Sequence, residues 1–199
     1  MANGTALVRL ASKLNASIAD TIKIVVENQP VWKEFAVDKK VDATHIDNSA
    51  DFSVNAKIAW DNKNIYLSLD VTDDVIYAVG NDQTWNLDNF EIYFDMQNGK
   101  IPQYPRGESK WPSSYNGKPG YWQLRLIPGR TFEEVNQNYF KGGAIQNYSI
   151  TDKGYKYELT VCMDSLLKGF VPSIGKEIGF DILGSDNDNN PFYRDQLSW

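Results

Sequence analysis

The chain has very little of the chemistry that cysteine and histidine supply. Its 199 residues include one cysteine, Cys162, and one histidine, His45. A single cysteine excludes an intramolecular disulfide framework, so stability must come from a hydrophobic core. A single histidine disfavours zinc sites built from several histidines, and it disfavours a catalytic triad, which needs a histidine together with a clear nucleophile elbow. Because a lone histidine is more often structural or exposed than a ligand, His45 is a weak site candidate.

Long apolar runs and an excess of positive charge are also missing. No stretch reaches the ~18 consecutive apolar residues that a membrane-spanning helix needs. Residues 1–5 lack the basic and apolar regions of a signal peptide. The 26 acidic residues outnumber the 20 basic ones, and the net charge of −6 disfavours nucleic acid or an anionic membrane as partner. The chain therefore fits either an intracellular protein or a part of a secreted one that follows its signal.

Aromatic residues, in contrast, are plentiful. They make up 13% of the chain, with six tryptophans and eleven tyrosines, and several fall in polar stretches typical of loops. Exposed aromatic rings reduce solubility unless they contact a ligand. The composition therefore favours a binding surface.

Apolar and polar residues alternate in many short segments, the pattern of half-buried strands. We expect strands at residues 21–27, 54–60, 65–71, 90–94, 121–127, 155–163 and 178–182. Residues 54–60 and 65–71 are separated by a short polar turn, which predicts a hairpin. No segment shows a sustained 3.6-residue period, and the strands are too closely spaced for helical crossovers. The prediction is one all-β domain over residues 1–199, an antiparallel two-sheet β-sandwich of jelly-roll or immunoglobulin-like type. At most one short helix is expected, at 164–167, and a long loop at 96–120.

The most informative stretch is residues 85–95. Its alternation places the apolar side chains on one face of a strand and Glu91 and Tyr93 on the other. Trp85 precedes this strand among polar neighbours, which favours a loop position, although a core position is an alternative. An aromatic ring beside a fixed carboxylate is an arrangement that suits a polyhydroxylated ring, because the C–H face of a pyranose is itself apolar.

A second strand supplies partners for this face. If residues 121–127 pair in the same sheet, Gln123 and Arg125 share the solvent face with Glu91 and Tyr93. The guanidinium of Arg125 and the carboxylate of Glu91 can then hold each other while spare donors and acceptors meet sugar hydroxyls. The alternative is a surface ion pair worth ~0–1 kcal/mol with no ligand.

Several motifs together resemble the family 9 carbohydrate-binding modules. They are residues 59–67 (AWDNKNIYL), 71–74 (VTDD), 85–95 (WNLDNFEIYFD), 123–125 (QLR), 178–182 (IGFDI) and 197–199 (LSW). The resemblance spans roughly residues 22–199. It implies a β-sandwich that binds glucose- or xylose-based saccharides without cleaving them. By position, Trp85 would be the stacking platform and Glu91 and Arg125 the hydrogen-bonding pair.

The same resemblance implies a setting for the chain. Such modules are usually attached to secreted bacterial xylanases or related enzymes, so we expect an extracellular or periplasmic, monomeric module that targets an enzyme to plant cell-wall glucan or xylan. Family members carry a second stacking aromatic beyond the last motif. Here Trp199 is a candidate substitute, and Asp88 is a further candidate ligand-binding residue.

A calcium site is a further candidate, although proline and leucine replace the glycine and glutamate of an EF-hand loop. Asp186 and Asp188 have the acidic spacing that begins such a loop. The segment is either an irregular calcium site, which the resemblance makes plausible, or a solvated loop. The Asp73–Asp74 pair poses the same choice.

Three other functions compete with non-catalytic saccharide binding, and one of them is that of a purely structural or protein-binding sandwich. A glycoside hydrolase would need two carboxyls across a cleft, for instance Asp88 and Glu91, but an arginine-paired carboxylate is a poor general acid. A haem-binding sandwich would use a methionine with a histidine or lysine, and the candidates are His45, Met96 and Met163. The sequence therefore predicts a sugar-binding module that is not an enzyme.

Overall fold

A computed structural model shows a β-sandwich. It describes residues 30–79, 84–99, 120–136, 140–188 and 194–199, together with the backbone of residues 4–11 and 19–26. Most of the loop predicted at 96–120 and the side chains of the strand predicted at 21–27 lie outside the described residues.

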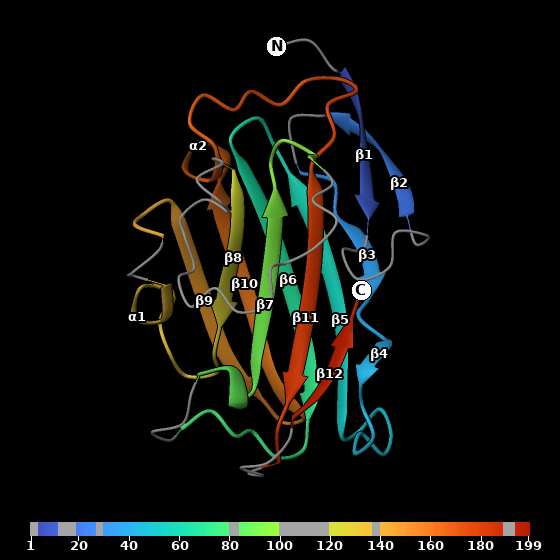
Figure 1. Ribbon diagram of the computed structural model, residues 1–199, viewed down its shortest axis with the longest axis vertical. Helices are drawn as coiled ribbons and strands as arrows, with labels where there is room; N and C mark the ends of the chain where they lie inside the picture. Colours follow the sequence, from blue (N-terminus) through green and yellow to red (C-terminus); the bar gives the residue numbers. More distant parts are fainter. Residues whose placement is uncertain are drawn as a thin grey trace.

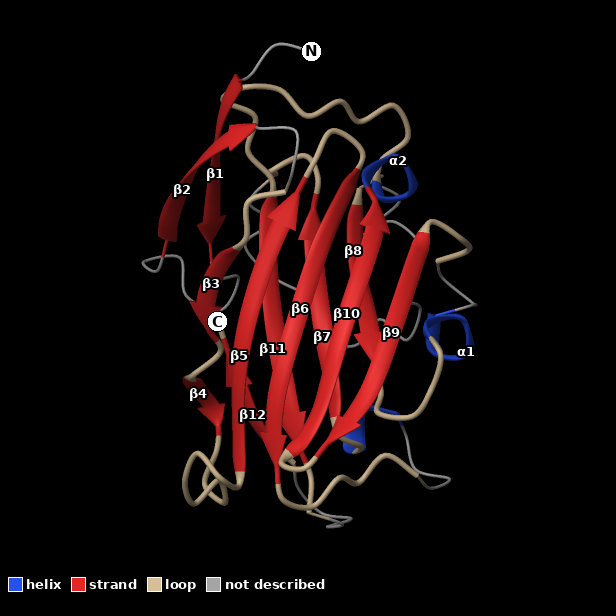
Figure 2. Cartoon of the chain, turned by 180° about the vertical axis from the view of Figure 1, so that it is seen from behind, coloured by secondary structure: helices blue, strands red, loops and turns tan. Residues whose placement is uncertain are grey.

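Two five-stranded antiparallel sheets form the layers of the sandwich (Figures 1 and 2). The front sheet has the order β4 (Lys39–Asp42), β12 (Asp195–Ser198), β11 (Gly179–Asp186), β7 (Asn89–Asp95) and β8 (Tyr121–Leu126). The back sheet has the order β3 (Lys33–Ala36), β5 (Phe52–Trp60), β6 (Asn64–Asp73), β10 (Gly154–Cys162) and β9 (Ala144–Thr151). A separate two-stranded sheet pairs β1 (Gly4–Ala11) with β2 (Ala19–Val26). The predicted all-β sandwich is confirmed.

Alternation along each strand places the apolar residues between the sheets. Phe90, Ile92 and Phe94 of β7 are 0%, 0% and 2% exposed, as their spacing predicted. The Phe90 ring packs against Phe52 and Tyr157 of the back sheet at centroid distances of 6.4 and 6.3 Å. Because one face of β7 is committed to this core, the opposite face is available for other contacts.

The predicted hairpin is formed by β5 and β6, which pair from Trp60 opposite Ile65 outward. Asp61 closes the turn, since its Oδ1 accepts the backbone N–H groups of Lys63 and Asn64 at 2.7 Å each. An aspartate that bonds the backbone two residues ahead is typical of tight turns.

In the part of the chain that the structure describes, helical structure is limited to short pieces. The helix α2 (Met163–Leu166) lies where one was expected, and the structure adds a second, α1 (Phe132–Asn136), and a 3₁₀ turn, η1 (Thr84–Asn86). At α1, Thr131 and Glu134 form a reciprocal cap, because each side chain accepts the other's backbone N–H, at 3.3 and 2.8 Å. This capping box is visible in the sequence and explains the additional helix. Among the described residues, none of the helices is long and apolar enough to cross a membrane.

Candidate functional site

Glu91 and Arg125 lie directly opposite each other on neighbouring strands of the front sheet. Their side chains form an ion pair and are only 7% and 16% exposed. The Tyr93 hydroxyl donates to the second carboxylate oxygen of Glu91 at 2.5 Å. Both oxygens of this carboxylate are thus held in place, and the pairing predicted from strand parity is confirmed.

Arg125 is fixed from two further directions. Its backbone N–H and C=O exchange hydrogen bonds with the Asn136 amide at 2.9 and 2.8 Å, so the side chain of Asn136 takes the place of a neighbouring strand. Its Nη1 donates to Thr84 Oγ1 at 2.8 Å, which ties the guanidinium to the first residue of η1. The ion pair and the η1 turn therefore form one connected unit.

Trp85 is the central residue of this turn, and its side chain is exposed. The residue is 43% exposed, and its backbone carbonyl accepts a hydrogen bond from Nη1 of Arg194. The loop position predicted for Trp85 is correct, and the alternative core position is not what the structure shows. An exposed indole that follows a residue bonded to a fixed ion pair suits a stacking platform.

Arg194 was not identified from the sequence. It immediately precedes β12, and burial lowers the pKa of its guanidinium, an effect that the nearby Glu91 carboxylate opposes. When the side-chain amide of Gln196 is oriented to satisfy its contacts with Arg194 and Ser185, its Oε1 accepts hydrogen bonds from Nε and Nη2 of Arg194 at 3.2 Å each. No local sequence signal reveals this residue, because its position depends on β12 pairing with β11.

Gln123 shares the outer face of the front sheet, opposite Tyr93 and partly exposed. Asp88, in contrast, is 0% exposed, and its two oxygens accept the backbone N–H groups of Tyr77 at 2.5 Å and Asn187 at 2.7 Å. A carboxylate buried in this way does not reach a ligand on the outer face. The expectation that Asp88 contacts a saccharide is therefore corrected.

Trp199 contacts Phe180, which pairs with Phe94 at the end of β7 that is farther from Trp85. Its ring packs edge-on against Phe35 at 5.7 Å and against Phe180 at 6.4 Å, and the Lys39 ammonium lies 5.8 Å above it. Phe35 and Phe180 border the core on the inner faces of the two sheets. Trp199 is thus a packing residue, and the prediction that it supplies the second stacking aromatic is wrong.

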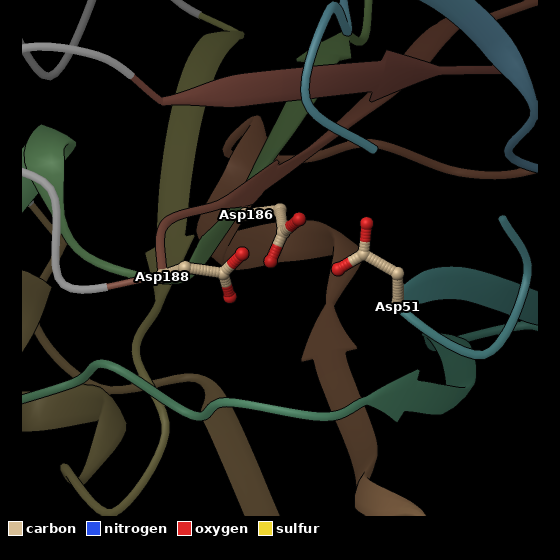
Figure 3. A group of neighbouring side chains, drawn as sticks. All are labelled: Asp51, Asp186 and Asp188. Carbon is tan, nitrogen blue, oxygen red and sulfur yellow. The ribbon is translucent and has the colours of Figure 1, made fainter. Parts of the chain in front are cut away.

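Two groups of acidic residues lie near the point where β11 ends and β5 begins, at one end of the sandwich (Figure 1). The inner acidic group consists of Asp73, Asp88 and Asp186, and the outer acidic group of Asp51, Asp186 and Asp188. Within each group, one oxygen of each carboxylate lies within 4.8 Å of the others. Figure 3 shows the outer group, in which the carboxylate of Asp51 faces those of Asp186 and Asp188, two residues of another segment of the chain.

Burial and mutual repulsion dominate the electrostatics of the inner group, and no described basic residue forms an ion pair with its carboxylates. Burial, with repulsion from the neighbouring carboxylates, raises the pKa of Asp73 to about 7, of Asp88 to about 9 and of Asp186 to about 8. Asp73 Oδ2 and Asp186 Oδ1 are buried and have no hydrogen-bond partner among the described residues. Burying a carboxylate oxygen without a partner is costly, which makes this position suitable for a cation.

The single histidine is bound to Asp195. His45 Nδ1 lies 3.0 Å from Asp195 Oδ2, and the backbone N–H of His45 donates to Asp195 Oδ1 at 3.2 Å. Met96 and Met163 are 1% and 4% exposed within the hydrophobic core. These positions are those of structural residues and do not favour the haem alternative.

The family of the chain follows from comparison with known proteins. A family model described as "Carbohydrate family 9 binding domain-like" matches residues 26–199. The chain belongs to this family. The family is one of non-catalytic carbohydrate-binding modules, so the chain is a carbohydrate-binding domain and not an enzyme. This overturns the hydrolase alternative, which the buried position of Asp88 also disfavours.

Curated relatives of this family 9 domain are much longer proteins. The chain is 26% identical over 171 residues to exoglucanase XynX of Acetivibrio thermocellus, and the match covers 85% of the chain and 14% of the relative. It is 27% identical over 143 residues to endo-1,4-beta-xylanase A of Thermoanaerobacterium saccharolyticum, and that match covers 72% of the chain and 11% of the relative. The chain thus spans only a small part of each.

Solved structures share its fold. A family 9 carbohydrate-binding module from Caldicellulosiruptor kristjanssonii in complex with glucose matches with a TM-score of 0.56 and 16% identity, over 83% of this chain and 73% of that one. A structure of such a module from the same organism in complex with cellotriose matches with a TM-score of 0.55 and 16% identity, over 85% and 72%. At this identity the likeness establishes the β-sandwich.

Proposed function

We propose that this domain binds a saccharide on the front sheet, with one sugar ring stacked on Trp85 and its hydroxyls bonded to Glu91 and Arg125. The observation that carries the proposal is the exposed Trp85 ring, which directly follows Thr84, a residue bonded to Arg125 of the ion pair. Gln123 on the same face and Arg194 beneath Trp85 would supply further polar contacts.

Preorganisation is the physical basis of this proposal. The donors of Arg125 and the acceptors of Glu91 are held by partners of the protein itself, so little side-chain entropy is lost when hydroxyls bind. An indole adds a large apolar contact at low conformational cost. Because Trp199 does not form a second platform, we expect a dissociation constant nearer millimolar than micromolar, a difference of ~4 kcal/mol.

The ligand class that we propose is plant cell-wall glucan or xylan. Relatives named as an exoglucanase and an endo-1,4-beta-xylanase, and structures with bound glucose and cellotriose, support this choice. The chain would then act as a monomeric module that brings an attached catalytic domain to its polymer. Such a module would work outside a bacterial cell or in the periplasm.

Calorimetric titration with glucose, xylose, cellotriose and xylotriose tests the proposal. Trp85→Ala should abolish saccharide binding and leave the melting temperature nearly unchanged, because the ring is exposed. A matched control is Trp32→Ala, since Trp32 is 46% exposed against 43% for Trp85 but packs beside Tyr66 of the back sheet. The control should bind like the parent chain. Unchanged affinity in Trp85→Ala would refute the platform.

We also propose that the acidic groups hold calcium, which prefers carboxylate oxygens and accepts six to eight of them with carbonyls and waters. Asp73, Asp88 and Asp186 would hold an inner ion, and Asp51 and Asp188 would contribute with Asp186 at the outer side. The orphaned oxygens of Asp73 and Asp186 support this fit. The bound ion would supply the counter-charge that the buried carboxylates lack.

Calcium titration followed by calorimetry and thermal unfolding tests this second proposal. Calcium should raise the melting temperature and chelation should lower it, because a ligand that binds only the folded state stabilises that state. Asp73→Asn should weaken calcium binding, whereas the control Asp70→Asn, an exposed residue of the same strand, should not. A melting temperature that is indifferent to calcium would exclude the site.

A further inference from the structure

We infer that a cation in the acidic groups orders the Trp85 platform through Asn187, so that cation binding and saccharide binding strengthen each other. This inference rests on both parts of the proposed function. It concerns the platform segment, residues 84–88, and the chain segment 186–188 that carries two of the acidic residues.

Asn187 joins the two segments directly. It lies between Asp186 and Asp188 in sequence and is 3% exposed. Its backbone N–H donates to Asp88 Oδ1 at 2.7 Å, and its side-chain Nδ2 donates to the backbone carbonyl of Asn86. One residue therefore connects a pair of candidate calcium ligands to the residue that follows Trp85.

The other end of the platform segment is anchored as well. Asp88 exchanges hydrogen bonds with the Tyr77 backbone, accepting at 2.5 Å through Oδ2 and donating its own N–H at 2.9 Å. Leu87, which precedes Asp88 in the platform segment, is 0% exposed. At the start of the segment, Thr84 accepts a hydrogen bond from the Arg125 guanidinium at 2.8 Å. Trp85 is thus held between the acidic groups and the ion pair, with little freedom to move independently.

Charge gives the coupling its direction. Three carboxylates within 4.8 Å of one another repel when they are ionised and no cation is present. A small separation of residues 186–188 from the platform segment relieves this repulsion, and it weakens the Asn187 hydrogen bonds. A cation draws the carboxylates together and restores the arrangement in which those bonds form.

A second unpartnered group points to the same position. The Tyr155 hydroxyl is fully buried without a hydrogen-bond partner among the described residues. Tyr155 pairs with Val71, two residues before Asp73, and the charges of Asp88 and Asp73 add to the effect of burial in raising the pKa of its hydroxyl. The hydroxyl can therefore bond to a water or carboxylate of an occupied site.

Thermodynamic linkage makes the inference measurable. If a cation strengthens saccharide binding by some factor, the saccharide must strengthen cation binding by the same factor. Coupling between sites in proteins is typically about 5- to 150-fold. We expect a value in this range, because the two sites share the hydrogen bonds of a single residue.

The experiment uses the full chain with cellotriose and calcium as probes. Cellotriose affinity is measured by calorimetry in saturating calcium and in a chelator, and calcium affinity with and without cellotriose. Circular dichroism confirms that the chain is folded in each condition. The expected result is a loss of cellotriose affinity of at least about 5-fold on chelation, with a matching reciprocal change in calcium affinity.

Asn187→Ala separates positioning from general stability. It removes the Nδ2 bond to Asn86 but keeps all the carboxylates, so calcium should still bind while cellotriose affinity becomes low and insensitive to calcium. If chelation unfolds the parent chain, the cellotriose affinity of this variant in saturating calcium decides whether Asn187 positions the platform. Asn55→Ala, at an exposed position of β5, is the control and should retain the coupling.

The outcomes distinguish this inference from the proposals beneath it. Equal cellotriose affinities with and without bound calcium would overturn the coupling and leave saccharide binding intact. If Asn187→Ala kept the coupling between calcium and cellotriose binding that the parent chain shows, the role of Asn187 would be overturned. Failure of cellotriose to bind in either condition would overturn the proposed function, and this inference with it.

Discussion

The ion pair between Glu91 and Arg125 is the most decisive place to perturb the site. Replacing Glu91 by alanine leaves a guanidinium that is 16% exposed without its charged partner, and it removes the acceptor of the Tyr93 hydroxyl. Hydrogen bonds to charged groups contribute about 1.5–3 kcal/mol, and removing one partner of a buried pair costs about 3–5 kcal/mol. Because Arg125 keeps its bond to Thr84, we expect a loss of about 2–3 kcal/mol in unfolding free energy.

Binding should fall by a comparable amount. A loss of ~2 kcal/mol or more corresponds to roughly a 30-fold weaker association, since each 1.4 kcal/mol is a factor of ten. The assay is a double-mutant cycle with Glu91→Ala, Arg125→Ala and the double variant, measured by urea unfolding and by calorimetry with cellotriose. The double variant should lose less stability than the two single variants together, because neither charge is then left alone.

Strict additivity in this cycle would refute the reasoning. It would mean that the two side chains act independently despite their contact in the front sheet. Unchanged cellotriose affinity in both single variants would refute their place in the saccharide site. Lys57→Ala, which removes an exposed ion pair with Glu34 on the back sheet, is the control and should leave binding unaltered.

Two further predictions concern stability. Burial raises the pKa of Asp88 to about 9 and of Asp186 to about 8, above the unfolded value near 3.8, so without a cation these groups favour folding at low pH. The melting temperature of the cation-free protein should therefore decrease as the pH rises from about 4 to about 9, and saturating calcium should remove this decrease. A melting temperature in the chelator that does not change with pH would contradict the raised pKa values. Gly154→Ala should destabilise the fold by ~2 kcal/mol or more in urea unfolding, because φ is +143° and a Cβ there would lie 2.4 Å from the Val71 carbonyl oxygen. Gly129, at φ +75° with no atom near its Cβ position, is the control, and equal losses at both sites would contradict a steric cause.

Strand parity accounts for what could be predicted of the site. Side chains in a strand alternate between faces with a period of two, so the burial of Phe90 placed Glu91 on the outer face without any tertiary information. The same rule placed Arg125 on the outer face of its strand, because its neighbour Leu124 faces the core. Only the assumption that β7 and β8 are neighbours was required, and the structure confirms that pairing.

Strands in which apolar and polar residues alternate only weakly were not predicted, because the prediction relies on this alternation. In β9, Ile145 and Ile150 are 68% and 71% exposed, so apolar residues do not mark the buried face of this edge strand. The strands β3, β4 and β12 have four residues each, too few to show a period. Pattern-based prediction depends on burial of one face, and edge strands are buried incompletely.

The sequence by itself determined the all-β class, the β5–β6 hairpin and the outward face shared by Glu91 and Arg125, because these follow from local alternation and turn chemistry. Only the tertiary structure decided where Asp88, Trp199 and Arg194 lie. Their positions depend on which distant segments meet when two sheets pack and β12 joins β11. The convergence of aspartates from the segments around residues 51, 73, 88 and 186 depends on the same packing. Contacts between segments so far apart carry no local signature, and for this reason the sequence could suggest the platform but not what holds it in place.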